Sequence, residues 1–304
     1  MLNSGAGRVI GLAALVILGL GLAGFVWGAI GAEFFGTKAL LPKPEVHLPP
    51  QAITGSHPGD ALHGGTDFVM TNTILSSFVA TGIILLVFLG GSARMSLVPG
   101  RFQSFLEVII EGLLGFIEGV VGRERSRQVL PIIATIFLFV AVNAWLGLLP
   151  IYQSFGFLEG NHLKAAFLRP AGTDLNMPLA LALVSFIFVE SLGVRAFGLR
   201  YFGKFIRVNS LLRGQIFAGL IDLFVGLLEL VSEFVRVISF TFRLFGNMLA
   251  GEILILVSAF LVAFVFTVPF YGLELLVGFV QALIFAGLTL VFASVALTPH
   301  GEDH

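Results

Sequence analysis

Residues 215–266 read QIFAGLIDLFVGLLELVSEFVRVISFTFRLFGNMLAGEILILVSAFLVAFVF, a mostly apolar run without a proline. As one α-helix this run would be about 75 Å long, whereas the hydrocarbon core of a bilayer is about 30 Å thick. Such a helix must tilt steeply, break, or lie partly in the membrane interface. The run therefore predicts a membrane helix that is too long for an upright span.

The composition of the whole chain predicts an all-α integral membrane protein in contact with lipid. Its 304 residues are 57% hydrophobic and only 12% charged, with a mean hydropathy of +1.01, whereas soluble domains carry about 25% charge. The 17 Lys and Arg balance 18 Asp and Glu, so no basic surplus is available to bind a phosphate backbone, and we expect no nucleic-acid partner. Without cysteine, the chain has no thiolate metal site and no disulfide.

Stretches without charge mark the expected spans, because an ionised side chain at mid-bilayer costs about 2.5–3.5 kcal/mol. The long stretches are 9–32, 68–93, 128–158, 253–273 and 275–301. A further apolar stretch, 178–197, contains Glu190. We expect about six membrane helices, with the last turn at residues 269–272, PFYG.

Positive charge predicts the orientation, because cytoplasmic connections carry an excess of Lys and Arg. The connections after the second and fourth spans are the arginine-rich ones, with Arg94, Arg101, Arg123, Arg125, Arg127, Arg195, Arg200, Lys204, Arg207 and Arg213. The alternate connections hold only Lys38, Lys43, Lys164 and Arg169. Six spans with both termini inside satisfy the rule.

Composition also divides the chain into regions. Residues 1–33 are expected to form an N-terminal membrane anchor, since the apolar stretch is long for a signal peptide. Residues 34–67 are rich in Pro and His and are expected to form an exposed loop. Their His47, His57 and His63 fit no metal-ligand spacing, so no metal site is expected there, and His300 and His304 are expected to be solvated.

Residues 101–120 show the three-and-four spacing of an amphipathic helix. Glu107, Glu111 and Glu118 share the side opposite the apolar residues. Helices that bind the membrane surface usually carry Lys and Arg on the polar side, so the acidic side favours contact with protein.

Ionisable and amide side chains gather inside the overlong helix and the helix after it. They are Asp222, Glu229, Glu233, Arg236, Arg243, Asn247, Glu252, Glu274 and Gln281. At about 100° per residue, Arg243 and Asn247 fall near the meridian of Glu229, and Glu252 points to the opposite side. Carboxylates at different depths can relay a proton by alternating between charged and neutral forms, whereas arginine stays charged and acts as a fixed gate.

Some of these residues have an equally good structural interpretation. Glu233 and Arg236 are three residues apart, so an ion pair that holds helices together competes evenly with a role in ion movement. Asp174 and Asn176 precede an expected helix start, where capping competes evenly with a channel role. No acid lies at pairing distance from Arg243 on its own helix, so this arginine predicts a functional site whose counter-ion lies elsewhere.

Four segments resemble subunit a of the F-type ATP synthase. They are 239–252, SFTFRLFGNMLAGE; 143–150, NAWLGLLP; 173–176, TDLN; and 281–285, QALIF. The first is long and specific, and the resemblance covers residues 68–304, which we interpret as the channel domain.

The resemblance implies a proton-translocating stator subunit with a pair of long, steeply tilted helices against a rotor ring of proton-carrying c subunits. Arg243 would face the ring carboxylate and keep an inlet and an outlet half-channel apart. The other matching positions near the half-channels and on the same helix are Asn247, Glu252, Glu274, Gln281 and Glu229. Residues added from burial, spacing or the shorter motifs are Glu233, Arg236, Asp222, Glu190, Asp174 and Asn176.

The family also implies partners and a location. These are the peripheral-stalk b subunits and the rest of the F-type complex, in what we expect to be a bacterial plasma membrane, with no cofactor and no catalysis in this chain. Many relatives pair a histidine with a carboxylate at the positions of Glu252 and Glu274. Here both are acidic, so one of the two is expected to stay protonated, and the sequence does not say which.

Two other functions remain as alternatives. A proton-coupled secondary transporter usually has two related halves, and residues 215–266 have no counterpart in the first half of the chain. A structural scaffold would tolerate exchange of the buried charges for apolar residues. The chain has no phosphate-binding GxxxxGK[ST] loop, so nucleotide chemistry belongs to another chain.

Overall fold

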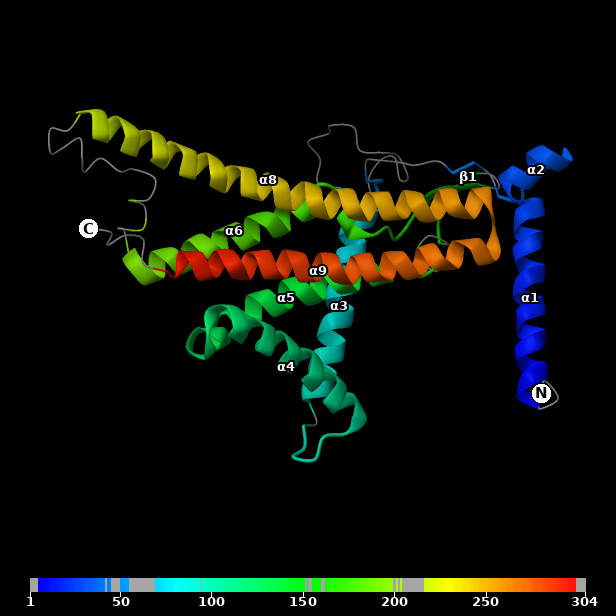
Figure 1. The fold of residues 1–304 in the computed structure, drawn as a ribbon, viewed down its shortest axis with the longest axis horizontal. Coiled ribbons are helices and arrows are strands. Elements are labelled where there is room, and N and C mark those ends of the chain that lie inside the picture. Colours follow the sequence, from blue (N-terminus) through cyan, green and yellow to red (C-terminus); the bar gives the residue numbers. More distant parts are fainter. Residues whose placement is uncertain are drawn as a thin grey trace.

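Helices dominate the computed structural model, which describes residues 5–41, 43–44, 50–54, 69–93, 95–150, 152, 155–159, 162–198, 201, 203 and 216–298 (Figure 1). The helices are α1 (Gly5–Trp27), α2 (Ala29–Phe35), α3 (Asn72–Ser92), α4 (Arg101–Val121), α5 (Arg123–Gly147), α6 (Asn176–Phe197), α8 (Ile216–Leu261) and α9 (Val268–Ala296). Two short 3-10 helices, η1 (Ala171–Thr173) and η3 (Phe264–Thr267), precede α6 and α9. Within the described residues six helices are long and apolar enough to cross a membrane, so the predicted all-α membrane class is confirmed.

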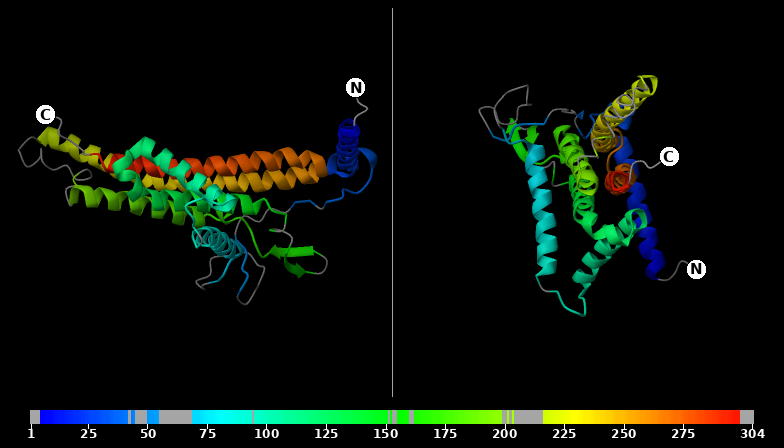
Figure 2. Two further views of the ribbon diagram at one scale, coloured as in Figure 1. Left: turned by 90° about the horizontal axis from the view of Figure 1, so that it is seen from below. Right: turned by 90° about the vertical axis from the view of Figure 1, so that its left-hand side faces the viewer.

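The two longest helices lie side by side and run antiparallel. Helix α8 has 46 residues and α9 has 29. In Figure 1 both run steeply inclined to α3, which they cross, and to α1, which stands beyond the end where they connect, while α5 and α6 pack against the pair. Figure 2, turned to face one end of the pair, shows α3 and α1 on either side of it. The arrangement agrees with a steep tilt of α8 and α9 relative to upright spans.

A narrow stripe of α8 is buried, and most of its remaining surface is apolar and exposed. Phe240, Leu244 and Met248 follow the helical repeat and face the core, whereas Phe234 and Phe242 are exposed. A helix that is apolar on all sides is suited to lipid or to another membrane subunit on its outer face. The helix is unbroken from Ile216 to Leu261, so a break, one of the three predicted possibilities, does not occur within these residues.

The predicted position of the last turn is wrong. The chain turns at residues 262–263, where Phe264 adopts a left-handed φ of 64°, and Pro269 lies in the first turn of α9. Proline lacks a backbone N–H and has a helical φ, so the first helical turn accepts it as readily as a loop does. The PFYG pattern therefore marks the beginning of α9.

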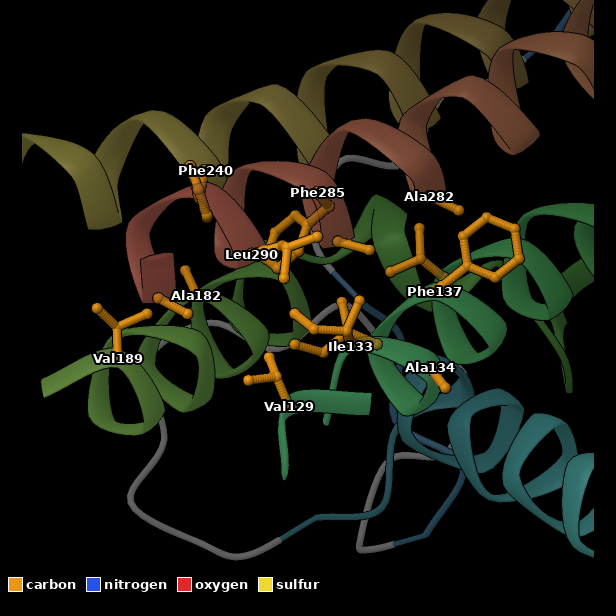
Figure 3. Packing of buried hydrophobic residues seen from close by; sticks show 14 of the residues in the cluster. Val129, Ile133, Ala134, Phe137, Ala182, Val189, Phe240, Ala282, Phe285 and Leu290 are labelled. Atoms are coloured by element: carbon orange, nitrogen blue, oxygen red, sulfur yellow. The ribbon is translucent and has the colours of Figure 1, made fainter. Parts of the chain in front are cut away.

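The core lies where α5, α6, α8 and α9 meet (Figure 3). Alanines on α9, including Ala282 and Ala293, are completely buried and allow close approach of the neighbouring helices. Phe285 fills the centre, with its ring centroid 5.0 Å from that of Phe240 on α8. The core therefore fixes α8 relative to α9 near the middle of both helices.

The predicted amphipathic helix is α4. Its buried residues Leu106, Leu113 and Ile117 follow the expected spacing, and the helix packs on α3, α5 and α9. The Cδ1 atom of Leu106 lies so close to Gly91 on α3 that a Cβ there would be 2.2 Å away. The apolar side of α4 thus contacts protein of the same chain.

Two short extended segments cover the end of α3. Residues 51–53 pair with residues 70–72, through bonds from Ile53 N to Met70 O (2.8 Å) and from Asn72 N to Gln51 O (3.1 Å). Strands β1 (Gly156–Glu159) and β2 (His162–Ala166), which the sequence analysis did not predict, pair antiparallel between α5 and α6. The predicted solvated histidines and several of the arginine-rich positions lie outside the described residues, namely His47, His57, His63, His300, His304, Arg94, Arg200, Lys204, Arg207 and Arg213.

Helix α1 contacts the α8–α9 connection through two glycines. A Cβ at Gly24 would lie 2.0 Å from the carbonyl oxygen of Ala263, and a Cβ at Gly28 would lie 2.3 Å from that of Leu261. The Ala263 N–H also donates to Gly24 O at 3.2 Å. The rest of α1 is largely exposed, so this backbone contact holds α1 against the long pair.

We predict that Gly24→Val separates α1 from the α8–α9 connection. The new side chain would overlap a backbone carbonyl, and overpacking of this kind costs about 1–3 kcal/mol. Hydrogen-exchange mass spectrometry should show faster exchange of the Ala263 amide, which bonds Gly24 O. Gly19→Val, at a glycine with open space around it, is the matched control. Equal protection in both variants would contradict the prediction.

Candidate functional site

Arg243 lies on the exposed face of α8. Its neighbours along this face are Phe242, Gly246 and Asn247, all exposed. Within the described part of the chain, no carboxylate lies at ion-pair distance from its guanidinium. An arginine in an apolar membrane helix needs a counter-ion, and the described residues do not supply one.

An amide pair flanks Arg243 on the side of α9. Asn247, one turn after Arg243, donates from Nδ2 to Oε1 of Gln281 at 2.7 Å. Gln281 is buried on α9. The pair joins the two long helices next to the exposed arginine, and it brings together two residues that the family motifs predict near the half-channels.

Glu252, further along α8, forms a buried ion pair with Arg169. The Arg169 Nη2 atom lies 2.8 Å from Glu252 Oε2, and Nε lies 3.2 Å from Oε1. Arg169 belongs to the segment before α6, and the sequence analysis assigned it no role. The two residues are 83 positions apart, so no local spacing could have revealed the pair.

Hydrogen bonds from α3 hold the segment that carries Arg169. The backbone N–H of Arg169 donates to Ser76 Oγ at 3.0 Å, and Thr73 Oγ1 donates to Asp174 Oδ2 at 2.9 Å. Asp174 Oδ1 also accepts from the Asn176 N–H at 3.1 Å, at the first residue of α6. These bonds support the helix-start interpretation of Asp174.

A buried tyrosine lies beside this polar segment, outside the spanning helices. Burial raises the pKa of Tyr152 above its usual range, which keeps the phenol protonated and neutral at physiological pH.

Glu274 on α9 and Glu252 line the same cavity. The cavity has a volume of about 220 Å³, and its wall includes Pro150, Pro170 and Tyr271. The carboxyl group of Glu274 lies against Gly251, where a Cβ would be 2.0 Å from Glu274 Cδ. Glycine at this position therefore allows the Glu274 carboxyl to lie next to the α8 backbone.

A second charged group lies nearer the beginning of α8. Glu233 pairs with Arg236, and the Arg236 guanidinium lies 3.5 Å from the ring centroid of Phe292 on α9. The ion pair lies within α8, and the cation–π contact links α8 to α9. Glu190 on α6 accepts from Tyr201 Oη at 3.3 Å.

The remaining predicted acids, Asp222 and Glu229, are half-buried on α8 before Glu233. The polar residues that were predicted to share one side of α8 therefore lie along the border between its buried and exposed surfaces. Glu233 is buried, whereas Arg243 and Asn247 are exposed. The structure brings the predicted residues into groups along the long pair: one around Glu252 and Glu274, one around Arg243 and one around Glu233.

Apolar spans with paired charges, and an outward-facing arginine in the middle of α8, are typical of integral membrane proteins of the ion-translocating class. The family model for the ATP synthase A chain matches residues 74–294, and the chain therefore belongs to the ATP synthase subunit a family. It is a component of the F-type ATP synthase complex, whose subunit a is the proton-translocating stator subunit.

Curated relatives agree with the family match. The chain is 33% identical to ATP synthase subunit a of Mycobacterium ulcerans over 241 residues, which cover 78% of this chain and 90% of that one. It is 32% identical to the Mycobacterium marinum protein over 262 residues, or 84% and 98% of the two chains. Identity to the Desulfosudis oleivorans protein is 31% over 237 residues, or 77% and 89%.

We predict that Gly251→Ala impairs proton pumping without preventing assembly. The methyl group would displace the flexible Glu274 carboxyl, and a misplacement of about 1 Å can cost roughly 100-fold in rate. ATP-driven proton uptake into inverted membrane vesicles measures the effect. Gly272→Ala, the same change at an open position on α9, should leave the rate unchanged. Parental pumping by the Gly251→Ala complex would refute the prediction.

Proposed function

We propose that this chain forms inlet and outlet half-channels at an interface with a rotor ring of c subunits and couples proton flow to rotation for ATP synthesis. The observation that supports this most strongly is Arg243, exposed on α8 with no carboxylate partner in the described part of the chain. Its counter-ion in this proposal is the proton-carrying carboxylate of the ring.

The charge of Arg243 explains why protons would not pass straight through. The guanidinium stays protonated at physiological pH, so it stabilises a ring carboxylate in front of it as an anion and carries no proton itself. A ring carboxylate must lose its proton before it reaches Arg243 and regain one after it has passed. Direct transfer between the half-channels is thereby excluded, and the ring must turn.

The polar groups on either side of Arg243 are suited to the two half-channels. We assign Glu252, Glu274 and their cavity to one of them, and the Asn247–Gln281 pair to the boundary near the arginine. For the other half-channel the chain offers Glu233, Arg236, Glu190, Asp222 and Glu229. Each proton that crosses 100 mV makes about 2.3 kcal/mol available for rotation.

The wider assignment follows from the family. We infer contacts with c subunits and peripheral-stalk b subunits, no cofactor, and catalysis in other chains of the complex. The proposed location is a bacterial plasma membrane, with both termini and the arginine-rich connections on the cytoplasmic side. Residues 68–304 form the channel domain in this proposal, and residues 1–33 form an additional anchor joined to it by residues 34–67.

Arg243→Ala tests the proposal. We expect loss of ATP synthesis driven by a pH gradient in vesicles that contain the assembled complex, because protons can then cross between the half-channels without turning the ring. Passive proton leak, measured in the same vesicles, should rise. Arg101→Ala, at an exposed arginine that begins α4, is the control and should synthesise ATP normally. Near-normal synthesis by assembled Arg243→Ala would refute the proposal.

A further inference from the structure

We infer that Arg169 positions Glu252 as a fixed anion, so that Glu274 is the carboxyl group of the shared cavity that takes up and releases protons. This inference rests on the proposed half-channels and goes beyond them. It assigns different roles to Glu252 and Glu274, which the sequence alone does not distinguish. It also assigns a role to Arg169, which lies outside the four family motifs.

The geometry of the ion pair favours a permanently charged Glu252. Arg169 donates to both carboxylate oxygens, and the two side chains are only 8% and 11% exposed. Hydrogen bonds between two ionised groups are about twice as strong as neutral ones. Protonation of Glu252 would give up this advantage at both hydrogen bonds to the buried guanidinium.

Arg169 itself is held in place from two other elements. Its backbone N–H bonds Ser76 on α3, and η1, two residues further on, lies against α8. A Cβ at Gly172 would be 2.7 Å from Cγ of Met248. The guanidinium is therefore anchored at a fixed place relative to Glu252, as a positioning residue requires.

Glu274 lies in a different environment within the same cavity. Among the described residues, no cation and no hydrogen-bond donor contacts its carboxyl group, and the side chain is 8% exposed. The nearby anion of Glu252 is already neutralised by Arg169, so no positive charge is left over for Glu274. Its neutral form is therefore favoured at rest, and its proton can be given up and replaced.

The proton balance of such a step is simple. The Glu274 carboxyl group gives its proton to a ring carboxylate, which breaks one O–H bond and forms another. The resulting carboxylate then takes one proton from a hydronium ion of the water that reaches the cavity, which leaves a water molecule. Glu252 and Arg169 keep their charges throughout.

Exchange of both partners of the pair separates this inference from the alternative in which both acids relay protons. The variants are Glu252→Gln, Arg169→Gln, the two changes combined, and Glu274→Gln. Glu111→Gln, at an exposed acid on α4, is the control. ATP-driven proton uptake into inverted vesicles is measured for each, together with the amount of the chain in the purified complex.

We expect Glu252→Gln to lose pumping or assembly, because it removes the anion that Arg169 bonds through two nitrogen atoms. The combined variant should regain pumping by about tenfold or more over Glu252→Gln, since replacing both members of a buried pair by neutral groups is often harmless. Glu274→Gln should lose pumping by about 100-fold or more, the contribution typical of a positioned acid or base. An assembled combined variant without pumping, or an active Glu274→Gln complex, would overturn the inference.

A spectroscopic readout keeps the test independent of how well the combined variant assembles. The infrared difference spectrum between the parent complex and Glu274→Gln should contain the band of a protonated carboxyl group. A difference that contains only carboxylate bands would overturn the inference. Arg243→Ala is measured in parallel, because normal coupling in that variant would refute the half-channel proposal itself, whatever the state of Glu252 and Glu274.

Discussion

A charge inside an apolar helix must be neutralised, and this requirement organises the contacts of α8. Glu252 meets it through Arg169, and Glu233 through Arg236 with the Phe292 ring nearby. Each of these contacts reaches another element or tightens the contact with α9. Arg243 differs because the described part of the chain offers it no such partner. This unmet requirement is the reason for proposing that α8 forms one half of an interface.

Helix type and extent could be predicted from the sequence, because they depend on local patterns. The lack of proline is compatible with the continuous helix α8. The three-and-four spacing predicted α4 to within one residue at its end. The turn was predicted too late because Pro269 is compatible with both a loop and a first helical turn. The strands β1 and β2 were missed because their residues lack the alternation that marks a half-buried strand.

The candidate site could be predicted only in part, for a related reason. Spacing on one helix separated Arg243 from Glu252 and placed Glu233 within reach of Arg236. It could not reveal Arg169, because that arginine reaches Glu252 from the segment before α6 and is fixed by Ser76 on α3. Ion pairs within one helix can be predicted from residue spacing. Pairs that join distant segments cannot, because they depend on how those segments pack.

The same contacts weigh against a scaffold and against a self-contained transporter. A scaffold gains nothing from leaving Arg243 exposed on an apolar helix, since membrane insertion of an arginine is costly. A transporter would need its polar groups to converge on one substrate cavity between two related halves. Here the amide pair, the carboxylates and the exposed arginine are spread along one face and one edge of the α8–α9 pair. That linear order suits stepwise proton transfer along an interface with a moving partner. Each step then requires its own group, either a fixed charge or a carboxyl that can exchange a proton.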